Sequence, residues 1–530
     1  MSTPEASTSE SKPVCVYIVP TRIQKKRLKD IKSAARRKKL SFVESFCPKV
    51  THIVSELDNR LKVARKLKIV DHSILIGIEL LRLTWFTACI KKAEILPIED
   101  EHRIPDPPPE EECAAPIETL PQITTTEWAC QRATPLRHFN EIFCTALEVL
   151  QLKAEFIDSG QDHLRSLAFR RASCVLKSLP FMITNVKQVK GQKDIGGHSR
   201  QVIKEILGEG FATEVEETLK DAWFQKVKLF STIFGVGPAT AKIWVEQGVN
   251  TVAEALVKCE RKNWMVQWGL AFHDDLSDLV QLIEAENLTA VIRAEAERIL
   301  PGVIVTLTGG FRRGKTNGHD VDLLFSHPEE GKEVNFLPKL LTQLEQRSLI
   351  LCGKLEKSSY GDRVLSRDYN TKGHMDHYEK WIGLMKLPKR FCHEKIDPSE
   401  YRFLMSNNAP VRGVENCTVD DYEPHSKKQR MCDGEPSAMS LASVPRTWTA
   451  RRVDLVIAPY SMYYYALLGW TGSKQFNRDI RLYSQKSLNQ KLTSHGLWNF
   501  EQNKKLPAAN EEEIFEHLSL TYQKPSDRNC

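Results

Sequence analysis

The chain has 530 residues and is expected to fold as several domains, because one hydrophobic core rarely organises more than about 250–300 residues. Hydrophobic residues make up 41% of the sequence and charged residues 27%, and no run of about 18 apolar residues occurs, which excludes a membrane-spanning protein. The net charge of +7 is too small to indicate a nucleic-acid partner by itself, and the 13 cysteines, none spaced as CxxC, favour reduced thiols over a zinc site.

After a polar tail at 1–13, residues 14–100 have the pattern of a small α/β domain. We predict strands at 15–19 and 50–54 and helices at 25–39 and 80–92. The strand VTHIV and the helix LTWFTACI, which carries Trp85, resemble those of a BRCT domain, a resemblance that implies end-joining proteins as partners. Ten lysines and arginines but one acid lie between Arg22 and Lys39, and this basic face is the candidate docking surface.

A linker is predicted at 101–126, where six prolines and many acids favour an extended, semi-rigid chain. From residue 127 to 300 the pattern is helical throughout. Apolar residues recur three or four positions apart in the stretches 139–152, 164–179, 202–207 and 291–299.

Two glycine turns interrupt this helical region. IGGHS at 195–199 leads into a helix predicted from Arg200, and FGVGP at 234–238 leads into a helix predicted from Ala239. The second turn has the signature of a helix-hairpin-helix motif, in which Gly235 and Gly237 let backbone N–H groups approach a phosphate closely. An ordinary glycine-capped helix turn is the alternative, but two such turns in one region favour sequence-independent DNA binding.

Residues 301–470 are rich in strand formers. We predict strands at 303–308, 321–326 and 453–458. The polar stretch 391–445 has no periodicity and is predicted to be a disordered insertion. A helix and short mixed elements follow over 471–530, so the whole chain is predicted to be a multidomain α+β protein.

The segment TGGFRRGKTNGHDVD at 308–322 carries the most specific chemical signal. Its residues 309–316 match the P-loop pattern GxxxxGKT, but a P-loop requires a helix that begins at GKT. Here Asn317–Gly318 favours a turn and a strand follows, which excludes a P-loop nucleotide hydrolase.

Three carboxylates fit a metal site better. Asp320 and Asp322 are two positions apart in a predicted strand, so they share one face about 6–7 Å apart while the intervening residue enters the core. Asp454 is the lone acid of the apolar strand RVDLVI. Neighbouring acids repel each other unless a cation lies between them, and carboxylate oxygens suit Mg²⁺. Two Mg²⁺ here would activate an attacking hydroxyl and steady a leaving pyrophosphate, with the glycine turn and Arg313 holding a triphosphate.

With GGFRRGK, GHDVD and RVDLV, the chain resembles a family X DNA polymerase of the branch that contains DNA polymerase mu and terminal deoxynucleotidyltransferase. Further matching segments are ACQR at 129–132, FGVG at 234–237, ALLGWTGS at 466–473 and EEIFEHL at 512–518. The resemblance covers nearly the whole chain. It implies a small helical DNA-binding domain at 127–225, fingers at 226–300, a nucleotidyltransferase palm at 301–470 and a thumb at 471–530.

The resemblance also assigns roles to single residues. Asp320, Asp322 and Asp454 would bind two Mg²⁺, or Mn²⁺ in their place. The incoming nucleotide would be held by Gly309, Gly310, Arg313, Lys315, His319, Gly469 and Trp470. DNA would be contacted by Lys474, Arg478, Arg481, Gly235 and Gly237, and a downstream 5′-phosphate by Arg171, His198 and Arg200. The backbone carbonyls of Ser231, Ile233 and Val236 would hold Na⁺ or K⁺.

The implied function is gap filling at double-strand breaks in non-homologous end joining, with dNTPs as substrates and a nuclear location. Lys474 in GWTGSK and SHGL at 494–497 favour the mu type. Template-independent addition to single-stranded 3′ ends is the alternative, and segment 354–373 occupies the loop that sets template dependence in this branch. An inactive scaffold is a third reading, against which the intact acids argue.

Two positions refine this expectation. Gly469 leaves no bulky side chain over the 2′ position of the nucleotide, so ribonucleotides are expected to be accepted. Val202 stands where some family members carry a Schiff-base lysine, so deoxyribose-phosphate lyase activity is not expected.

Overall fold

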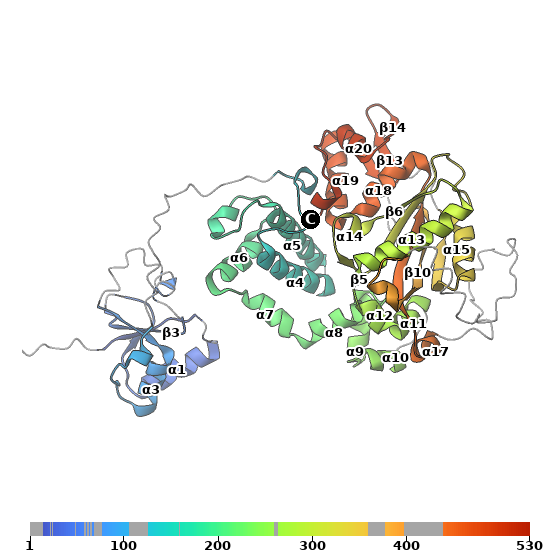
Figure 1. The fold of residues 1–530 in the computed structure, drawn as a ribbon. Helices are drawn as coiled ribbons and strands as arrows, with labels where there is room; N and C mark the ends of the chain where they lie inside the picture. The colour runs from blue at the N-terminus through green and yellow to red at the C-terminus, as the bar shows by residue number, and fades with distance from the viewer. Residues whose placement is uncertain are drawn as a thin grey trace, which may run out of the picture. The chain divides into compact units, whose positions relative to one another are not determined.

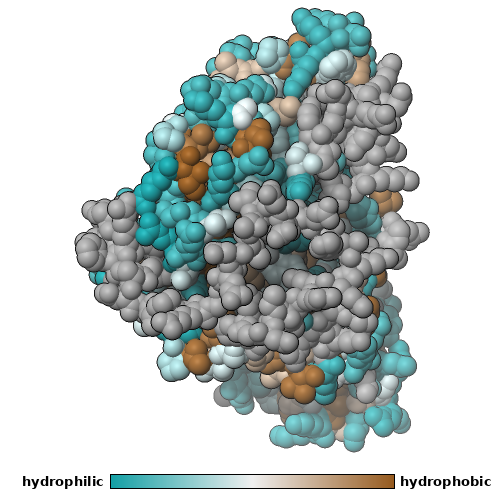
Figure 2. Space-filling view, turned by 90° about the vertical axis from the view of Figure 1, so that its right-hand side faces the viewer, coloured by the Kyte–Doolittle hydropathy of each residue, from teal (hydrophilic) through white to brown (hydrophobic). Residues whose placement is uncertain are grey.

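The computed structural model describes residues 14–104, 126–157, 160–258, 263–358, 377–396 and 438–530, apart from Arg22, Gln24, Pro48 and most of 58–76. Four stretches lie outside these residues: the tail 1–13, most of the predicted linker, residues 359–376, which contain most of the loop segment 354–373, and residues 397–437 of the predicted insertion 391–445. The chain divides into two compact units, Met1–Thr119 and Leu120–Cys530 (Figure 1). No helix among the described residues is long and apolar enough to cross a membrane. On the face shown in Figure 2, hydrophobic residues form small scattered groups among hydrophilic ones.

The first unit is built on a parallel four-stranded sheet. Its strands follow the order β2 (Phe42–Val43), β1 (Val16–Ile18), β3 (His52–Ser55), β4 (Glu79–Arg82), with helices α1 (Lys25–Arg37) and α3 (Leu83–Lys92). The helix predicted from residue 80 begins at Leu83 instead, because buried Leu80 and Leu81 belong to β4. Trp85 is fully buried, as a core position of α3 requires. Residues 101–104 belong to this unit rather than to the linker, since Ile104 is buried and its N–H donates to the carbonyl of Leu80 at 2.9 Å.

The second unit begins with helices. They are η3 (Ala129–Gln131), α4 (Glu141–Ile157), α5 (Gly160–Ser178), η4 (Val186–Val189), α6 (Gly197–Glu209) and α7 (Thr213–Lys220), then α8 (Ala222–Ser231), α9 (Pro238–Glu246), α10 (Val252–Lys258), α11 (Trp264–Ala271) and α12 (His273–Ser277). One hydrophobic core joins α4, α5 and α6, and a second joins α8 to α11. We call the first group the small helical domain and the second the fingers.

A five-stranded sheet forms the palm. Its strands follow the order β6 (Ile304–Leu307), β8 (Val321–Ser326), β11 (Trp448–Ile457), β10 (Glu379–Pro388), β9 (Ile350–Glu356), and only the central β8–β11 pair is parallel. Helices α13 (Leu282–Ile299) and α15 (Phe336–Gln346) share one core with this sheet, and α18 (Tyr463–Thr471) shares another. Helix α13 therefore packs with the palm, whereas the sequence placed residues up to 300 in the fingers.

Short elements complete the palm. They are β5 (Val280–Gln281), α14 (Gly309–Arg312), β7 (Asn317–Gly318), η6 (Lys389–Cys392), α17 (Ala438–Ser443) and η8 (Tyr460–Met462). The prediction of disorder over 391–445 is wrong at its ends: Phe391 and Ile396 are buried, and Asn287 Nδ2 donates to the carbonyl of Phe391 at 2.8 Å. Residues 354–356, expected in a loop, belong to β9.

The thumb follows α18. It comprises α19 (Lys474–Leu488), the antiparallel strands β12 (Gln490–Thr493), β13 (Gly496–Asn499) and β14 (Lys504–Leu506), α20 (Glu511–His517) and η9 (Pro525–Asp527). Cys130 of η3 is part of the thumb core, and the N–H of Ala129 donates to Asp479 Oδ2 at 3.0 Å. The N-terminal residues of the second unit therefore pack into the thumb, which is the C-terminal part of the same unit. In Figure 1, α5 lies beside the C-terminal end of the chain.

Candidate active site

The three predicted acids meet at the centre of the palm sheet. Asp322 lies in β8 and Asp454 opposite it in β11, because the parallel register pairs these two residues. Asp320 stands just before β8 rather than inside it. One carboxylate oxygen from each acid lies within 4.8 Å of those of the other two, and Val321 and Leu323 are buried in the core as predicted. This is the geometry of a cation site with oxygen ligands.

The close, buried packing of the three acids disfavours their charged forms. Burial, followed by repulsion from Asp320 and Asp454, raises the pKa of Asp322 well above its usual value. Burial also raises the pKa of Asp454, although Arg452 opposes that shift. Because a divalent cation would offset both the burial and the repulsion, the acid cluster fits such a metal.

Arg452 is the main residue of this cluster that the sequence analysis missed. Its guanidinium lies 2.9 Å from Asp454 Oδ2 and 3.5 Å from Asp320 Oδ2, and it stacks over the ring of Phe234 at 5.5 Å. The available signal was its position two residues before Asp454 in the same strand, which places both side chains on one face. Arg452 supplies the positive charge that balances two of the three acids.

The glycine turn lies directly against the acids. Residues 309–312 form the single helical turn α14 rather than an open turn, and Gly309 has φ +63°. A Cβ at Gly309 would be 2.3 Å from Asp322 Oδ2, so only glycine leaves this carboxylate its place. No helix begins at Lys315, which agrees with the exclusion of a P-loop, although Asn317–Gly318 form strand β7 and not the predicted turn.

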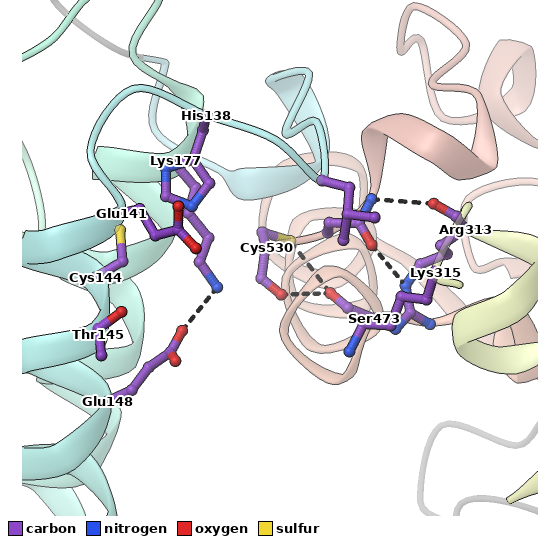
Figure 3. Close-up of a pocket in the computed structure, with 12 residues that line it drawn as sticks. His138, Glu141, Cys144, Thr145, Glu148, Lys177, Arg313, Lys315, Ser473 and Cys530 are labelled. Atoms are coloured by element: carbon purple, nitrogen blue, oxygen red, sulfur yellow. Dashed lines mark hydrogen bonds and ion pairs between the residues drawn. The ribbon is translucent and has the colours of Figure 1, made fainter. Parts of the chain in front are cut away.

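Arg313 connects the glycine turn to the thumb. Its Nη1 donates to the carbonyl of Thr471, and its Nε donates to Asn529 Oδ1 at 3.2 Å. Burial lowers the pKa of Arg313 and that of Lys315. Both cations line a cavity of about 420 Å³, while His319 is exposed. Figure 3 shows Arg313 and Lys315 on one side of this cavity and Lys177, paired with Glu148, on the other.

A buried ion network, also missed from the sequence, holds the glycine turn in place. Arg312 Nη1 donates to Thr471 Oγ1 and its Nη2 to Glu511 Oε2, both at 2.6 Å. Arg528, fully buried, donates to the other oxygen of Glu511 at 2.6 Å. The thumb and the palm turn are therefore joined through one carboxylate.

The remaining predicted nucleotide and DNA residues lie along α18, at the end of the palm, and along α19 of the thumb. A Cβ at Gly469 would be 3.2 Å from the Cβ of Ser494, and Trp470 is half-buried. Lys474 is exposed at the start of α19, and Arg481 is half-buried. Burial and then the nearby charges of Arg171 and Arg170 lower the pKa of Arg478. Arg171 and Arg478 thus form one basic patch between α5 and α19.

The second glycine turn separates α8 from α9. Gly235 has φ +84°, and a Cβ there would be 2.5 Å from the Cβ of Met265 in α11. Gly237 precedes α9 with open space around it. Of the three predicted carbonyl ligands, that of Ile233 accepts the N–H of Val236 at 2.9 Å. Of the remaining candidates, Ser231 is the last residue of α8 and Val236 lies within the turn.

The first glycine turn precedes α6, which begins at Gly197, three residues earlier than predicted. His198 Nε2 lies 2.6 Å from Glu214 Oε2 and its ring contacts Phe169. Arg200 is half-buried on the same helix. Val202 is buried in the core of the small helical domain. His198, Arg200 and Val202 therefore lie together on α6 of the small helical domain.

The chain matches three family models, described as the DNA polymerase beta thumb over residues 466–529, the DNA polymerase beta palm over 282–405 and the fingers domain of DNA polymerase lambda over 228–277. The palm match begins at α13, in agreement with the packing of that helix.

Relatives match over nearly the full length. DNA nucleotidylexotransferase of Xenopus laevis is 32% identical over 524 residues, which cover 98% of this chain and 94% of that protein. DNA-directed DNA/RNA polymerase mu of Homo sapiens is 34% identical over 522 residues, with the same coverage. DNA nucleotidylexotransferase of Homo sapiens is 31% identical over 529 residues, which cover 97% of this chain and 93% of that protein.

Proposed function

The chain belongs to the family X DNA polymerases, in the branch of polymerase mu and DNA nucleotidylexotransferase, and we propose that it fills short gaps at broken DNA ends under the direction of a template. It is a nucleotidyltransferase that acts on DNA and nucleotides. The identities of 31–34% do not separate the two kinds of relative, so the proposal depends on particular residues.

The observation that carries the proposal is the packing of the SHGL segment. His495 is fully buried, its ring lies 4.0 Å from that of Tyr378, and the hydroxyl of Tyr378 donates to the carbonyl of Ser494 at 2.6 Å. Burial lowers the pKa of His495 to about 3, so the ring is neutral at physiological pH. Tyr378 lies five residues after the segment 354–373 that resembles the template-setting loop, so this cluster holds the chain just beyond that segment against the thumb.

For catalysis we propose that Asp320, Asp322 and Asp454 hold two Mg²⁺. Bound metal would make the primer 3′-hydroxyl a better nucleophile and neutralise the leaving pyrophosphate. Arg313 and Lys315 would orient the triphosphate from the cavity, and Gly309 lets the backbone of α14 approach it. Arg452 would keep Asp320 and Asp454 in place through its ion pairs.

The remaining sites follow from the same family. Gly235 and Gly237, with Na⁺ or K⁺ at the carbonyls of Ser231, Ile233 and Val236, would hold a DNA phosphate, and the Ile233 carbonyl keeps a second lone pair for the ion. His198 and Arg200, with the basic patch of Arg171 and Arg478, would face the 5′ side of a gap.

We also propose that ribonucleotides are accepted. One of the relatives from Homo sapiens is named DNA-directed DNA/RNA polymerase mu. Gly469 has no side chain that could collide with the 2′-hydroxyl of a ribonucleotide. A strong preference for dNTPs, measured at equal concentrations, would oppose this.

The first unit is proposed to be a BRCT domain that binds end-joining proteins in the nucleus. Its parallel sheet with a buried tryptophan supports the domain type. On the basic helix α1, Lys32 and Arg36 pair with Glu44. Arg27 pairs with Glu56 at 3.8 Å, and the exposed Arg37 and Lys38 would face a partner. The basic run KKQR at 427–430, which is a candidate nuclear import signal in the sequence, lies outside the described residues.

The decisive experiment compares extension of a gapped duplex with extension of a bare single strand without template. We expect preferential extension of the gapped duplex. Tyr378→Phe, which removes only the hydroxyl bound to Ser494, should weaken this preference while total activity persists. Robust addition to the bare strand alone would identify a terminal transferase, and Asp320→Ala serves as the inactive control.

A further inference from the structure

An aromatic side chain of the fingers contacts the arginine that pairs with the acid cluster. Phe234 belongs to the second glycine turn, between α8 and α9, and the guanidinium of Arg452 lies over its ring at 5.5 Å. Both side chains are half-buried. The contact therefore joins the turn that is proposed to hold a DNA phosphate to β11, the palm strand that carries Asp454.

Helix α11 holds the ring of Phe234 in place. The ring of Trp264 packs against it edge to face, with 5.8 Å between the ring centroids. A Cβ at Gly269 would lie 2.3 Å from the carbonyl oxygen of Phe234, and a Cβ at Gly235 would lie 2.5 Å from the Cβ of Met265. The turn and α11 thus approach each other closely at two glycines, so the ring has a fixed position from which it contacts the palm.

Arg452 pairs with two of the three acids. Its Nη2 donates to Asp454 Oδ2 at 2.9 Å and its Nε donates to Asp454 Oδ1 at 3.3 Å. Its Nη1 lies 3.5 Å from Asp320 Oδ2. Among the residues that the structure describes, no ion pair joins Arg452 to Asp322. The guanidinium therefore lies at one edge of the acid cluster rather than at its centre.

The ring of Phe234 gives Arg452 a partner outside the cluster. A guanidinium is attracted to the face of an aromatic ring, and its plane can stack on the ring while its N–H groups bond carboxylates. Without the ring, only the carboxylates would attract Arg452, and its long side chain would be drawn among all three acids, into the space that a divalent cation needs. With the ring, the guanidinium keeps one partner even when a cation shares its two acids.

We propose that Phe234 is a positioning residue for the metal site, whose ring keeps the Arg452 guanidinium at the edge of the acid cluster so that a divalent cation can bind among the acids. This inference rests on the proposed function, in which Asp320, Asp322 and Asp454 hold the metal. Removal of the ring should weaken metal binding through competition from Arg452, although every metal ligand remains. We expect the dissociation constant of the metal to rise about fivefold, equivalent to roughly 1 kcal/mol, the usual scale of a cation–π contact.

The test measures Mn²⁺ binding to the full chain by electron paramagnetic resonance of the free ion, without DNA or nucleotide, so that the DNA contacts of the glycine turn do not enter. Phe234→Leu removes the ring but keeps an apolar side chain, whereas Phe234→Tyr keeps the ring. The matched control is Trp448→Leu in β11. It removes a half-buried ring that lies 5.0 Å from the guanidinium of Arg446, which pairs with Asp275. We expect weaker Mn²⁺ binding in Phe234→Leu, and affinities close to wild type in Phe234→Tyr and in the control.

A double-mutant cycle tests whether the ring acts through Arg452. In the Arg452→Gln background the competing cation is gone, so the further change Phe234→Leu should leave the Mn²⁺ affinity unaltered. If Phe234→Leu does not fold, Phe234→Met, which also lacks a ring, takes its place in both measurements.

Three outcomes would overturn the proposal: wild-type Mn²⁺ binding in Phe234→Leu, equal weakening in Phe234→Tyr, and weakening that persists in the Arg452→Gln background. Asp454→Ala separates this proposal from the proposed function. Loss of Mn²⁺ binding in Asp454→Ala together with no effect of Phe234→Leu would reject only the role of the ring. Wild-type Mn²⁺ binding in Asp454→Ala would reject the metal site itself, and the role of the ring with it.

Discussion

Gly309 and Gly235 both have a left-handed backbone conformation, but different neighbours occupy the space where their side chains would be. Gly309 has φ +63° and Gly235 has φ +84°, a region that costs other residues about 1–2 kcal/mol. At Gly309 the space of the missing side chain is filled by a carboxylate oxygen of Asp322, whereas at Gly235 it is filled by the Cβ of Met265 and the backbone of α11. Gly309 leaves room for the Asp322 carboxylate, and Gly235 leaves room for helix α11 of the fingers. A shared glycine-turn pattern therefore does not imply a shared role.

The largest effect should come from removing one of the acids that cluster with Asp322, the carboxylate that Gly309 accommodates. Asp454→Ala deletes one of the three proposed cation ligands and leaves Arg452 without its closest partner. We expect primer extension to fall by roughly a thousandfold, since the metal supplies several kcal/mol of transition-state stabilisation. Extension should be measured against Mg²⁺ concentration and DNA binding by anisotropy. Retained DNA affinity is required, and unchanged extension would refute the site.

Gly309→Ala should cost about a hundredfold in kcat/KM, because the new Cβ would push the Asp322 carboxylate from its position by an ångström or more. Gly314→Ala is the matched control. Gly314 has φ +92° in the same loop, but its Cβ would meet nothing within 4 Å, so it carries the backbone strain without the collision. Equal losses in the two variants would show that strain, rather than the displaced carboxylate, is responsible.

The acid cluster was largely predictable from the sequence because its signals are local. Asp320 and Asp322 are two residues apart, and the strand predicted at 321–326 coincides with β8. Asp454 stood out as the lone acid of an apolar run. Strand β4, with the sequence ELLR, was not predicted because α3 begins at the next residue and its apolar residues continue the same pattern. The spacing of apolar residues alone does not show where the strand ends and the helix begins.

The long-range contacts could not be predicted in this way. Arg312 and Glu511 are 199 residues apart, and neither lies in a pattern that marks it as buried. Their pairing exists because the thumb folds back on α14, which is a property of the tertiary packing. Single-sequence reasoning finds sites built from one or two strands and misses those built from opposite ends of a unit.

The Glu511 network joins the Gly309 turn to the thumb through Arg312. Glu511→Gln leaves Arg312 and buried Arg528 without their counter-charge, and we expect the free energy of unfolding to fall by about 3 kcal/mol at pH 7. Burial tends to raise the pKa of Glu511, but Arg528 and Arg312 outweigh it and lower the pKa below the usual 4.5.

The lowered pKa of Glu511 determines how its contribution to the free energy of unfolding depends on pH. Because the folded pKa is lowered, the carboxylate stabilises the protein fully above the unfolded value and loses that contribution as the pH falls through the folded pKa. The difference between wild type and Glu511→Gln, measured by urea unfolding, should therefore shrink as the pH is lowered below 4.5. A difference that stays constant over this range would contradict the assignment.

Gly235→Ala should have the smallest effect on catalysis and so tests the other half of the comparison. A Cβ there would lie 2.5 Å from that of Met265 and 2.9 Å from the backbone nitrogen of Val266, so α11 must shift away from the turn. Overpacking of this kind costs about 1–3 kcal/mol, which thermal unfolding would detect. Gly248→Ala, at φ +77° with nothing within 4 Å, isolates the strain alone.

Since the acids of the palm are untouched in Gly235→Ala, the single-turnover rate at saturating DNA should change less than about threefold, under 1 kcal/mol. A loss as large as that of Gly309→Ala would mean that both glycines serve the chemistry, and the distinction between them would fail.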